Sequence, residues 1–306
     1  IRESIEPTIT VPDQTSLYGL DLAKRHYSIS EWNKEWGARR ERASELISFE
    51  IAEEPQAVVY VLKTKFNSSF SLEQRITFSV LHNRICMEAD IDKDEVFTPE
   101  SIYFTFPLKL NEGWSCSFDS AGKYADLDKT QLGHCSKDWL TVDKTVSVYD
   151  KNCGITLACP DAPLVQVGGF RFGKYSEYVE REQNPLLLAW PMNNYWGTNF
   201  KASQPGKVSL RYELTPIDSF EPSHAFELGI MSEKAYEVQG MASCDEDTDG
   251  KLFEFSGSQD VRVQYIKKSV DGNVLIMLNH IGEKTQKISL SLPGKRIKKV
   301  CEVSVL

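Results

Sequence analysis

A short stretch around residue 195 carries side chains suited to contacting a hydroxyl-rich ligand. Carboxamides and a threonine hydroxyl can donate to and accept from hydroxyl groups, and Tyr and Trp rings can pack on the apolar face of a sugar ring. A structural interpretation, with the rings in a core and the asparagines shaping turns, fits the composition equally well. The candidate contacts are Asn193, Asn194, Tyr195, Trp196, Thr198 and Asn199.

The carboxylates do not form a recognisable catalytic pair. Retaining cleavage of a glycosidic bond needs two carboxyl groups about 5 to 5.5 Å apart, and the spacing in this sequence identifies no such pair. Asp161 lies in a Pro-Asp-Ala-Pro segment, where an aspartate usually closes a turn. The other acidic candidates are more simply explained as structural or solvated side chains; they are Asp138, Glu177, Glu180 and Glu182. We therefore predict no catalytic residue in this chain.

The histidines and cysteines lack the spacing of a metal site. The five histidines are widely separated and form no His-x-Asp, His-x-His or His-Glu-x-x-His motif. His134 and Cys135 could supply two ligands, but two ligands do not complete a tetrahedral site. The acidic run 243–250 resembles a calcium-binding loop that lacks its closing Glu. We predict no metal site here.

Charge and composition exclude several kinds of partner. The chain has 306 residues and a formal net charge of −9, and no Lys/Arg stripe alternates with aromatic residues, so we expect no nucleic acid partner. No run approaches the roughly 18 apolar residues that span a bilayer, so we expect no membrane partner. Seven scattered cysteines, an odd number, favour free thiols in a reducing compartment and hence the cytoplasm.

Alternation of apolar and polar residues predicts an all-β chain with one short helix. The helix is expected from Ser223, a suitable N-cap, to about Glu233, and the segment 113–133 is rich in aspartate and expected to be a loop. Period-two patterns predict strands at 57–62, 72–81, 84–91, 102–106, 140–149, 154–159, 164–168, 186–190 and 208–214, then at 252–256, 261–267, 274–280, 286–292 and 298–305.

These elements predict two all-β units separated by an acidic linker. We expect an N-terminal arm or connecting segment over 1–48 and a large β unit over 49–242. The linker is placed at 243–250 and a small β-sandwich at 251–306.

Four ordered motifs resemble the C-terminal region of family 38 glycoside hydrolases, the α-mannosidases. They lie within residues 100–107, 131–142, 154–165 and 192–212, the last containing Asn-Asn-Tyr-Trp-Gly-Thr-Asn-Phe. The final residues, including Val300-Cys-Glu-Val, resemble the family's terminal β module. The chain departs from the family at Gly197, where a histidine is usual, and in the turn at 132–134.

The resemblance implies a large galactose-mutarotase-like supersandwich followed by a small β-sandwich. It also implies that the chain is scaffold and one wall of the substrate cleft in a retaining α-mannosidase-like enzyme acting on mannose-containing carbohydrate. The zinc and the nucleophile would belong to an N-terminal catalytic domain that this chain lacks, and a chain beginning with Ile1 is expected to be part of a longer protein. An apolar patch left by that missing domain would let copies of the chain associate.

Two alternatives remain open at the level of sequence. One is a stand-alone carbohydrate-binding module, which would bind mannosides by itself. The other is a mutarotase-like epimerase or lyase that acts through His134 and a nearby carboxylate.

Overall fold

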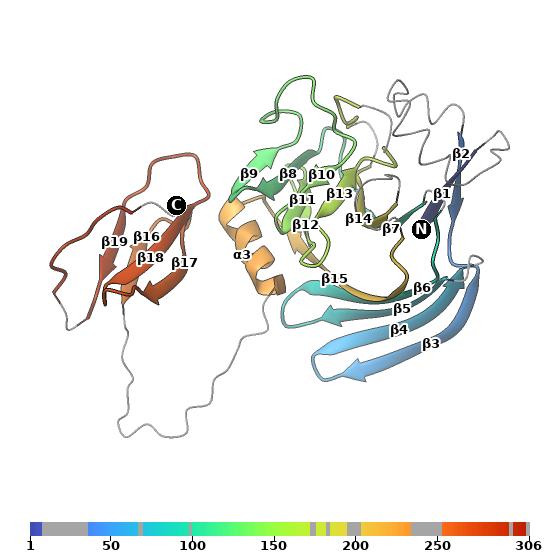
Figure 1. The fold of residues 1–306 in the computed structure, drawn as a ribbon, viewed down its shortest axis with the longest axis horizontal. Helices are drawn as coiled ribbons and strands as arrows, with labels where there is room; N and C mark the ends of the chain where they lie inside the picture. The colour runs from blue at the N-terminus through green and yellow to red at the C-terminus, as the bar shows by residue number, and fades with distance from the viewer. Residues whose placement is uncertain are drawn as a thin grey trace. The chain divides into compact units, whose positions relative to one another are not determined.

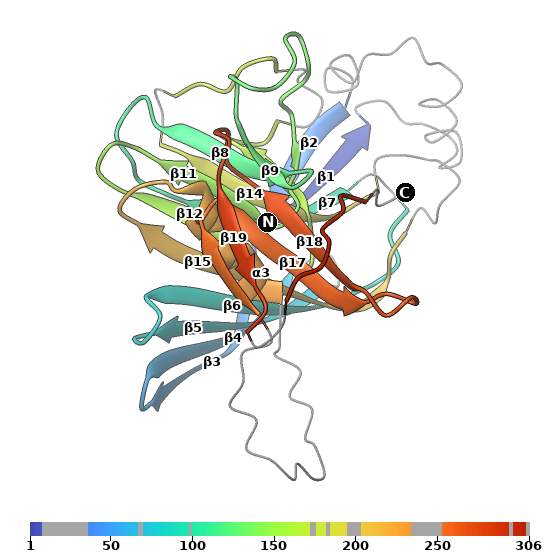
Figure 2. The same ribbon diagram turned by 90° about the vertical axis from the view of Figure 1, so that its left-hand side faces the viewer.

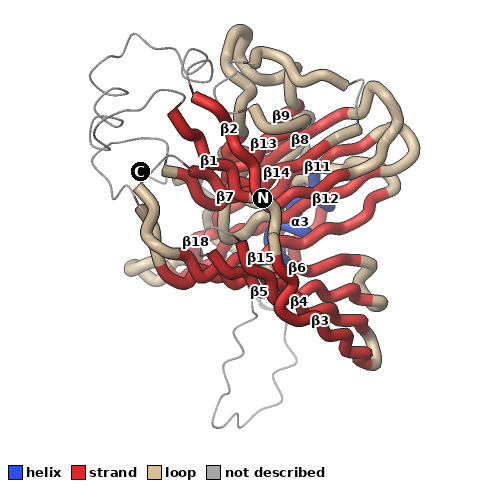
Figure 3. The backbone as a smooth tube through the Cα atoms, turned by 90° about the vertical axis from the view of Figure 1, so that its right-hand side faces the viewer, coloured by secondary structure: helices blue, strands red, loops and turns tan. Residues whose placement is uncertain are grey.

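The computed structural model describes residues 1–7, 36–66, 70–97, 100–171, 176–181, 184–194, 203–233, 253–293 and 296–303. The chain divides into two compact units, residues 1–233 and 234–306. Strands make up most of the regular structure in the described residues, as Figure 3 shows. None of the helices in this part of the chain is long and apolar enough to cross a membrane.

The described residues of the first unit form two large antiparallel sheets and one helix (Figure 1). In spatial order, the six-stranded sheet contains β10 (Leu140–Thr141), β13 (Leu164–Val167), β14 (Leu186–Asn193), β7 (Glu100–Pro107), β1 (Arg2–Pro7) and β2 (Trp36–Glu41). The nine-stranded sheet contains β3 (Glu45–Glu54), β4 (Ala57–Phe66), β5 (Phe70–Ser79), β6 (Arg84–Lys93), β15 (Gly206–Ile217), β12 (Gly154–Ala158), β11 (Thr145–Tyr149), β8 (Ser115–Ser120) and β9 (Lys123–Asp126). Figure 2 shows β3 at the free edge of this second sheet.

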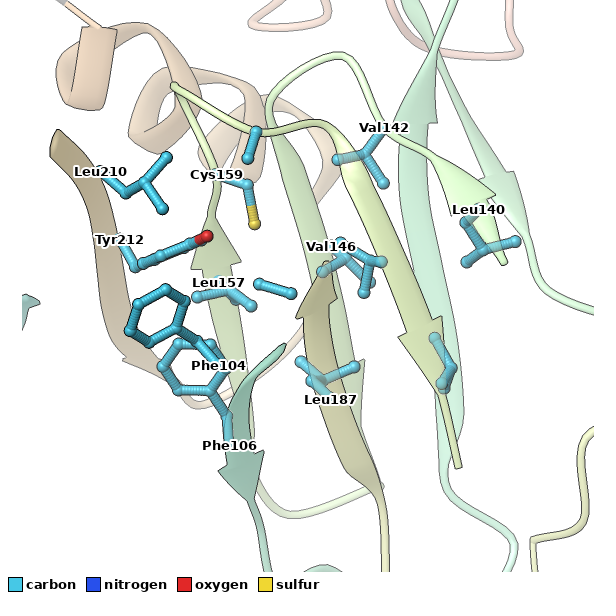
Figure 4. Close-up of a cluster of buried hydrophobic side chains, with 14 of the residues drawn as sticks. Phe104, Phe106, Leu140, Val142, Val146, Leu157, Cys159, Leu187, Leu210 and Tyr212 are labelled. Atoms are coloured by element: carbon cyan, nitrogen blue, oxygen red, sulfur yellow. The ribbon is translucent and has the colours of Figure 1, made fainter. Parts of the chain in front are cut away.

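The core lies between the two sheets because alternate residues of each strand are apolar on the facing side. From β7, Phe104 and Phe106 reach Tyr212 on β15, with ring centroids 5.2 and 5.7 Å apart. Leu157 and Val146 complete this part of the core, and both are fully buried (Figure 4). The predicted supersandwich is therefore confirmed.

The helix α3 (Pro222–Glu233) confirms the predicted helix and packs on the nine-stranded sheet. Close approach is possible because Gly229 carries no side chain: a Cβ there would lie 2.9 Å from the Cβ of Lys144. The Lys144 ammonium contacts Glu233 at 2.7 Å, which ties the last turn of the helix to the sheet.

Within 1–48, predicted as an N-terminal arm or connecting segment, the described residues belong largely to strands of the two sheets. β1 pairs with both β2 and β7, so it continues the six-stranded sheet, and β3 already begins at Glu45. The partners of β1 lie far away in the chain, and a local pattern does not reveal such pairing. The first compact unit ends at Glu233, before the expected boundary at 242, and the expected linker 243–250 lies outside the described residues.

The loop predicted over 113–133 is also wrong, because it contains the hairpin of β8 and β9. Cys116 and Phe118 are buried and alternate with serines along β8. Ala121 and Gly122 form the tight turn with φ values of 51° and 75°, as a two-residue hairpin requires.

The second unit contains two strand pairs within its described residues. β16 (Glu254–Gly257) pairs with β19 (Ile288–Ser291), and β17 (Val261–Lys268) pairs with β18 (Val274–His280). These are four of the five strands that the sequence predicts there. The fifth is wrong for residues 298–303, which form no strand, and its remaining residues lie outside the described part.

Candidate functional site

The candidate loop begins where β14 ends, beside the start of β7. Asn193 is paired in register with Ser101. The Asn194 side chain is buried, and its Oδ1 accepts a hydrogen bond from the backbone N–H of Glu100 at 2.6 Å. Its Nδ2 donates to the carbonyl of Val96 at 3.0 Å, and its own backbone N–H donates to the carbonyl of Glu100 at 3.1 Å. Asn194 is thus tied to the segment 96–100 by three hydrogen bonds.

The other end of the loop is tied to the same segment. The Oγ of Ser203 accepts a hydrogen bond from the backbone N–H of Val96 at 3.0 Å, and Ser203 is buried. Asn194 and Ser203, the described residues that flank 195–202, are therefore both bonded to the backbone of the same segment, at Val96 and Glu100. The predicted contacts Tyr195, Trp196, Thr198 and Asn199 lie outside the described residues.

A small cavity of about 20 Å³ lies at the foot of this loop. A space of this size holds about one water molecule, so it is much smaller than a sugar ring. Six of its eight lining residues are of polar or charged types. The lining residues are Lys93, Glu100, Ser101, Ile102, Met192, Asn193, Asn194 and Gln204.

Beneath the cavity lies a network of buried charges. The Glu100 carboxylate contacts the Lys93 ammonium through one oxygen and the Arg2 guanidinium, at 2.8 Å, through the other. Arg2 also contacts Glu41 at 3.0 Å. The side chains of Lys93 and Glu100 are only 6% and 4% exposed. The two cations and two anions of this buried set balance, as buried ions must for the fold to be stable, and Glu41 also contacts the exposed guanidinium of Arg39 at 3.5 Å.

Two stacked aromatic rings, Trp190 on β14 and Tyr103 on β7, lie next to the network. The indole Nε1 of Trp190 donates to the Oγ of Ser101 at 2.7 Å, and its ring stacks on Tyr103 with centroids 5.8 Å apart. Gln166 donates to the Tyr103 hydroxyl at 3.2 Å, and burial raises the pKa of that hydroxyl above its ordinary range. Trp190 and Tyr103 are each 1% exposed, so they fix the site and cannot stack on a ligand.

The other candidates from the sequence have structural partners. An oxygen of Asp138 accepts the backbone N–H of Ser176 at 2.8 Å, and Asp161 accepts the backbone N–H of Arg211 at 2.8 Å. The His134 side chain is 92% exposed and contacts Glu177 at 3.1 Å. None of these carboxylates faces the cavity at 193–194.

No three His, Cys, Asp or Glu side chains are grouped to hold a metal ion within the described residues. The zinc implied by the family resemblance therefore finds no fitting set of ligands in this part of the chain.

The charged residues of the network were missed by the sequence analysis. Lys93 and Glu100 stand at a strand end and a strand start, where a charged side chain is usually solvated. Their burial depends on Arg2, which reaches Glu100 only because β1 pairs with β7. The one feature of the sequence that pointed to Glu100 was the motif at 100–107 that resembles family 38, because it begins with this residue.

No protein-family model matches the sequence, and no curated protein matches it either. Among solved structures, an α-mannosidase from Enterococcus faecalis V583 matches with a TM-score of 0.58 and 11% identity, over 84% of this chain and 32% of that chain. A protein in glycosyl hydrolase family 38 from Enterococcus faecalis matches with the same TM-score and identity, over 86% of this chain and 34% of that chain. A galactose 1-epimerase from Lactobacillus acidophilus reaches a TM-score of only 0.36 with 9% identity, over 56% of this chain and 67% of that chain.

The fold of this chain is that of the C-terminal region of family 38 α-mannosidases. The chain spans about a third of the length of the two mannosidase-family proteins that it matches. At 11% identity the match shows the fold of the chain and does not show an activity.

Proposed function

We propose that this chain is the C-terminal portion of a retaining α-mannosidase-like glycoside hydrolase, where it serves as scaffold and as one wall of the substrate cleft. The observation that carries the proposal is that Asn194 and Ser203, which flank residues 195–202, are both bonded to the backbone of Val96 or Glu100. Fixed flanking residues favour a preorganised binding segment.

The residues of the loop divide into anchors and contacts. Both polar atoms of the Asn194 amide already bond to the backbone, so we assign it to anchoring. Asn193, Thr198 and Asn199 would supply hydrogen bonds to sugar hydroxyls, and Tyr195 with Trp196 would supply the apolar faces. The zinc and the nucleophile would lie in an N-terminal catalytic domain of the longer protein.

An apolar strip along β3 supports the presence of a partner domain. Leu46, Ile47, Phe49 and Ile51 are each about half exposed, and Phe49 stacks on Tyr60 at 6.0 Å. An exposed apolar edge strand usually marks an interface. We propose that the catalytic domain covers this strip. Light scattering of the isolated chain should then detect oligomers, and a clean monomer at high concentration would count against the interface.

The thiols support a reducing compartment, and we propose the cytoplasm. The described residues contain six free cysteines, at 86, 116, 135, 153, 159 and 301. Thiol labelling of protein from unlysed cells tests this. Recovery of all six in the reduced form is the expected result, and disulfide-linked peptides would contradict it.

The function is tested with the complete protein that contains this chain. We expect hydrolysis of an aryl α-mannoside with release of the α-anomer first, as detected by NMR. Asn193→Ala should raise KM or lower kcat/KM about tenfold, corresponding to about 1.4 kcal/mol of lost binding. His134→Ala is the matched control, because this exposed side chain does not line the cavity beside Asn193 and Asn194, and the activity of the variant should not change. The proposal is overturned if the complete protein does not hydrolyse α-mannosides. It is also overturned if His134→Ala abolishes the activity while Asn193→Ala leaves it unchanged.

A further inference from the structure

A lysine and a cysteine lie in direct contact in the loop before β10. The Nζ of Lys137 is 2.7 Å from the Sγ of Cys135 and 3.4 Å from the carbonyl oxygen of the same residue. This nitrogen–sulfur distance is shorter than an ordinary N–H···S hydrogen bond, since sulfur is a large atom and a weak acceptor. The two side chains are only two positions apart in the chain.

The position of the ammonium is unusual because none of the carboxylates in the described part of the chain is paired with it. Lys137 is 4% exposed, and buried lysines are normally paired with an acid. Within the described residues, both groups contacted by this Nζ belong to Cys135. Its backbone N–H is held by the carbonyl of Ser176, which fixes the lysine in the loop. The amine is thus held against the sulfur.

We propose that Cys135 and Lys137 form an oxidant-dependent covalent modification site, in which peroxide converts the thiol to a sulfenic acid and the lysine amine then displaces its hydroxyl. In the first step the S–H bond is replaced by S–OH, peroxide is reduced, and one water leaves. In the second step an S–N bond forms, the S–O bond breaks, and the ammonium loses one proton to the leaving hydroxyl and another to solvent. The product is a sulfenamide, and a thiol reductant restores both side chains.

The surroundings favour this cysteine over two others in the same unit. Cys135 is partly exposed, so peroxide can reach it. Cys116 and Cys159 are buried, and burial raises the pKa of the Cys116 thiol to about 12, so these thiols are poor targets. The amine needs no diffusion to reach the sulfenic sulfur, because the fold already holds the two atoms together, which favours the intramolecular step strongly over attack by external thiols.

The test is peptide mapping of the full chain after treatment with hydrogen peroxide. The peptide containing both residues should be lighter by about two hydrogen masses, and trypsin should fail to cleave after Lys137 because its amine is blocked. Dithiothreitol should restore both the mass and the cleavage. Cys153 is an internal control: it is exposed, no lysine amine contacts its sulfur among the described residues, and it should gain oxygen or react with dimedone.

The matched variant is Lys137→Arg, which keeps the positive charge but replaces the nucleophilic amine with a guanidinium. Its peptide should become heavier by one oxygen and be trapped by dimedone at Cys135. The proposal is overturned if the wild-type peptide shows the same gain of oxygen, reacts with dimedone to the same extent, and contains an unmodified Lys137. Circular dichroism of both proteins checks that the fold is intact. This result is independent of the glycosidase proposal, since it requires no carbohydrate.

Discussion

Removing the central carboxylate of the buried network should destabilise the first unit strongly. The perturbation is Glu100→Gln, which keeps the size of the side chain and one acceptor oxygen but removes the charge. Glu100 contacts Lys93 and Arg2, whose side chains are 6% and 11% exposed. The network of two cations and two anions would change from neutral to a net charge of +1.

The magnitude follows from the two ion pairs that are lost. At an effective dielectric constant of about 20, an ion pair at about 4 Å contributes roughly 4 kcal/mol. Part of this is offset because the glutamine forms neutral hydrogen bonds and a freed lysine can turn toward water. We expect a net loss of about 3–5 kcal/mol in the free energy of unfolding, the range typical of a buried pair that loses one partner. For a unit of this size the melting temperature should fall by roughly 10 °C.

The assay is urea denaturation followed by tryptophan fluorescence, with two companion variants. Lys93→Met combined with Glu100→Gln restores neutrality, because Arg2 keeps its contact with Glu41. This double variant should therefore be more stable than Glu100→Gln alone. Glu73→Gln removes an exposed contact with Lys63 and should cost at most about 1 kcal/mol.

One pattern of results would refute the reasoning. If Glu100→Gln costs no more than Glu73→Gln, the carboxylate is not buried among cations as described. If adding Lys93→Met lowers stability further, the cost does not arise from an unbalanced charge.

Three further predictions address other parts of the first unit. Asn194→Ala should lower the free energy of unfolding by about 2–4 kcal/mol, because two buried backbone groups lose their partners; a loss below about 1 kcal/mol in urea denaturation would contradict its anchoring role. Backbone N–H groups, led by that of Asn111, hold the pKa of Asp150 at about 2, below its ordinary 3.8, so the stabilisation by this carboxylate is present above pH 4 and is lost as the pH falls toward 2. Asp150→Asn should therefore destabilise the protein at pH 6 and have little effect near pH 2, and an equal effect at both would contradict this. Gly154→Ala should lower the melting temperature by several degrees, since its Cβ would lie 2.5 Å from the Cβ of Tyr149; an unchanged melting curve would show that the hairpin can shift at no cost.

Local patterns predicted most of the central strands and the helix. β6 alternates clearly, β4 opens with a run of β-branched and aromatic residues, and the helix start is marked by Pro222 and Ser223, so each signal lies within a few residues. The hairpin of β8 and β9 was missed because its aspartates and serines suggested a loop. The buried residues of β8 are in fact consecutive, because Ser117 and Asp119 are buried beside Cys116 and Phe118, so polarity was a poor guide to burial in this strand.

The charge network could not be predicted from local sequence. Arg2 and Glu100 are 98 positions apart, and Arg2 and Glu41 are 39 apart, so their contacts arise from the pairing of β1 between β7 and β2. By contrast, the loop after Asn193 was predicted from the chemistry of its side chains. The bonding of its flanking residues Asn194 and Ser203 was not predicted, because hydrogen bonds to distant backbone groups leave no periodic pattern.

The central claim is that the loop 195–202 forms a wall of the mannoside cleft. The most direct measurement compares kcat/KM for an aryl α-mannoside in the complete protein, its Trp196→Ala variant and a Tyr178→Ala control, the last removing an exposed ring outside the loop. We predict a loss of about tenfold or more for Trp196→Ala and no change for Tyr178→Ala. Equal kcat/KM values for all three proteins would contradict the claim.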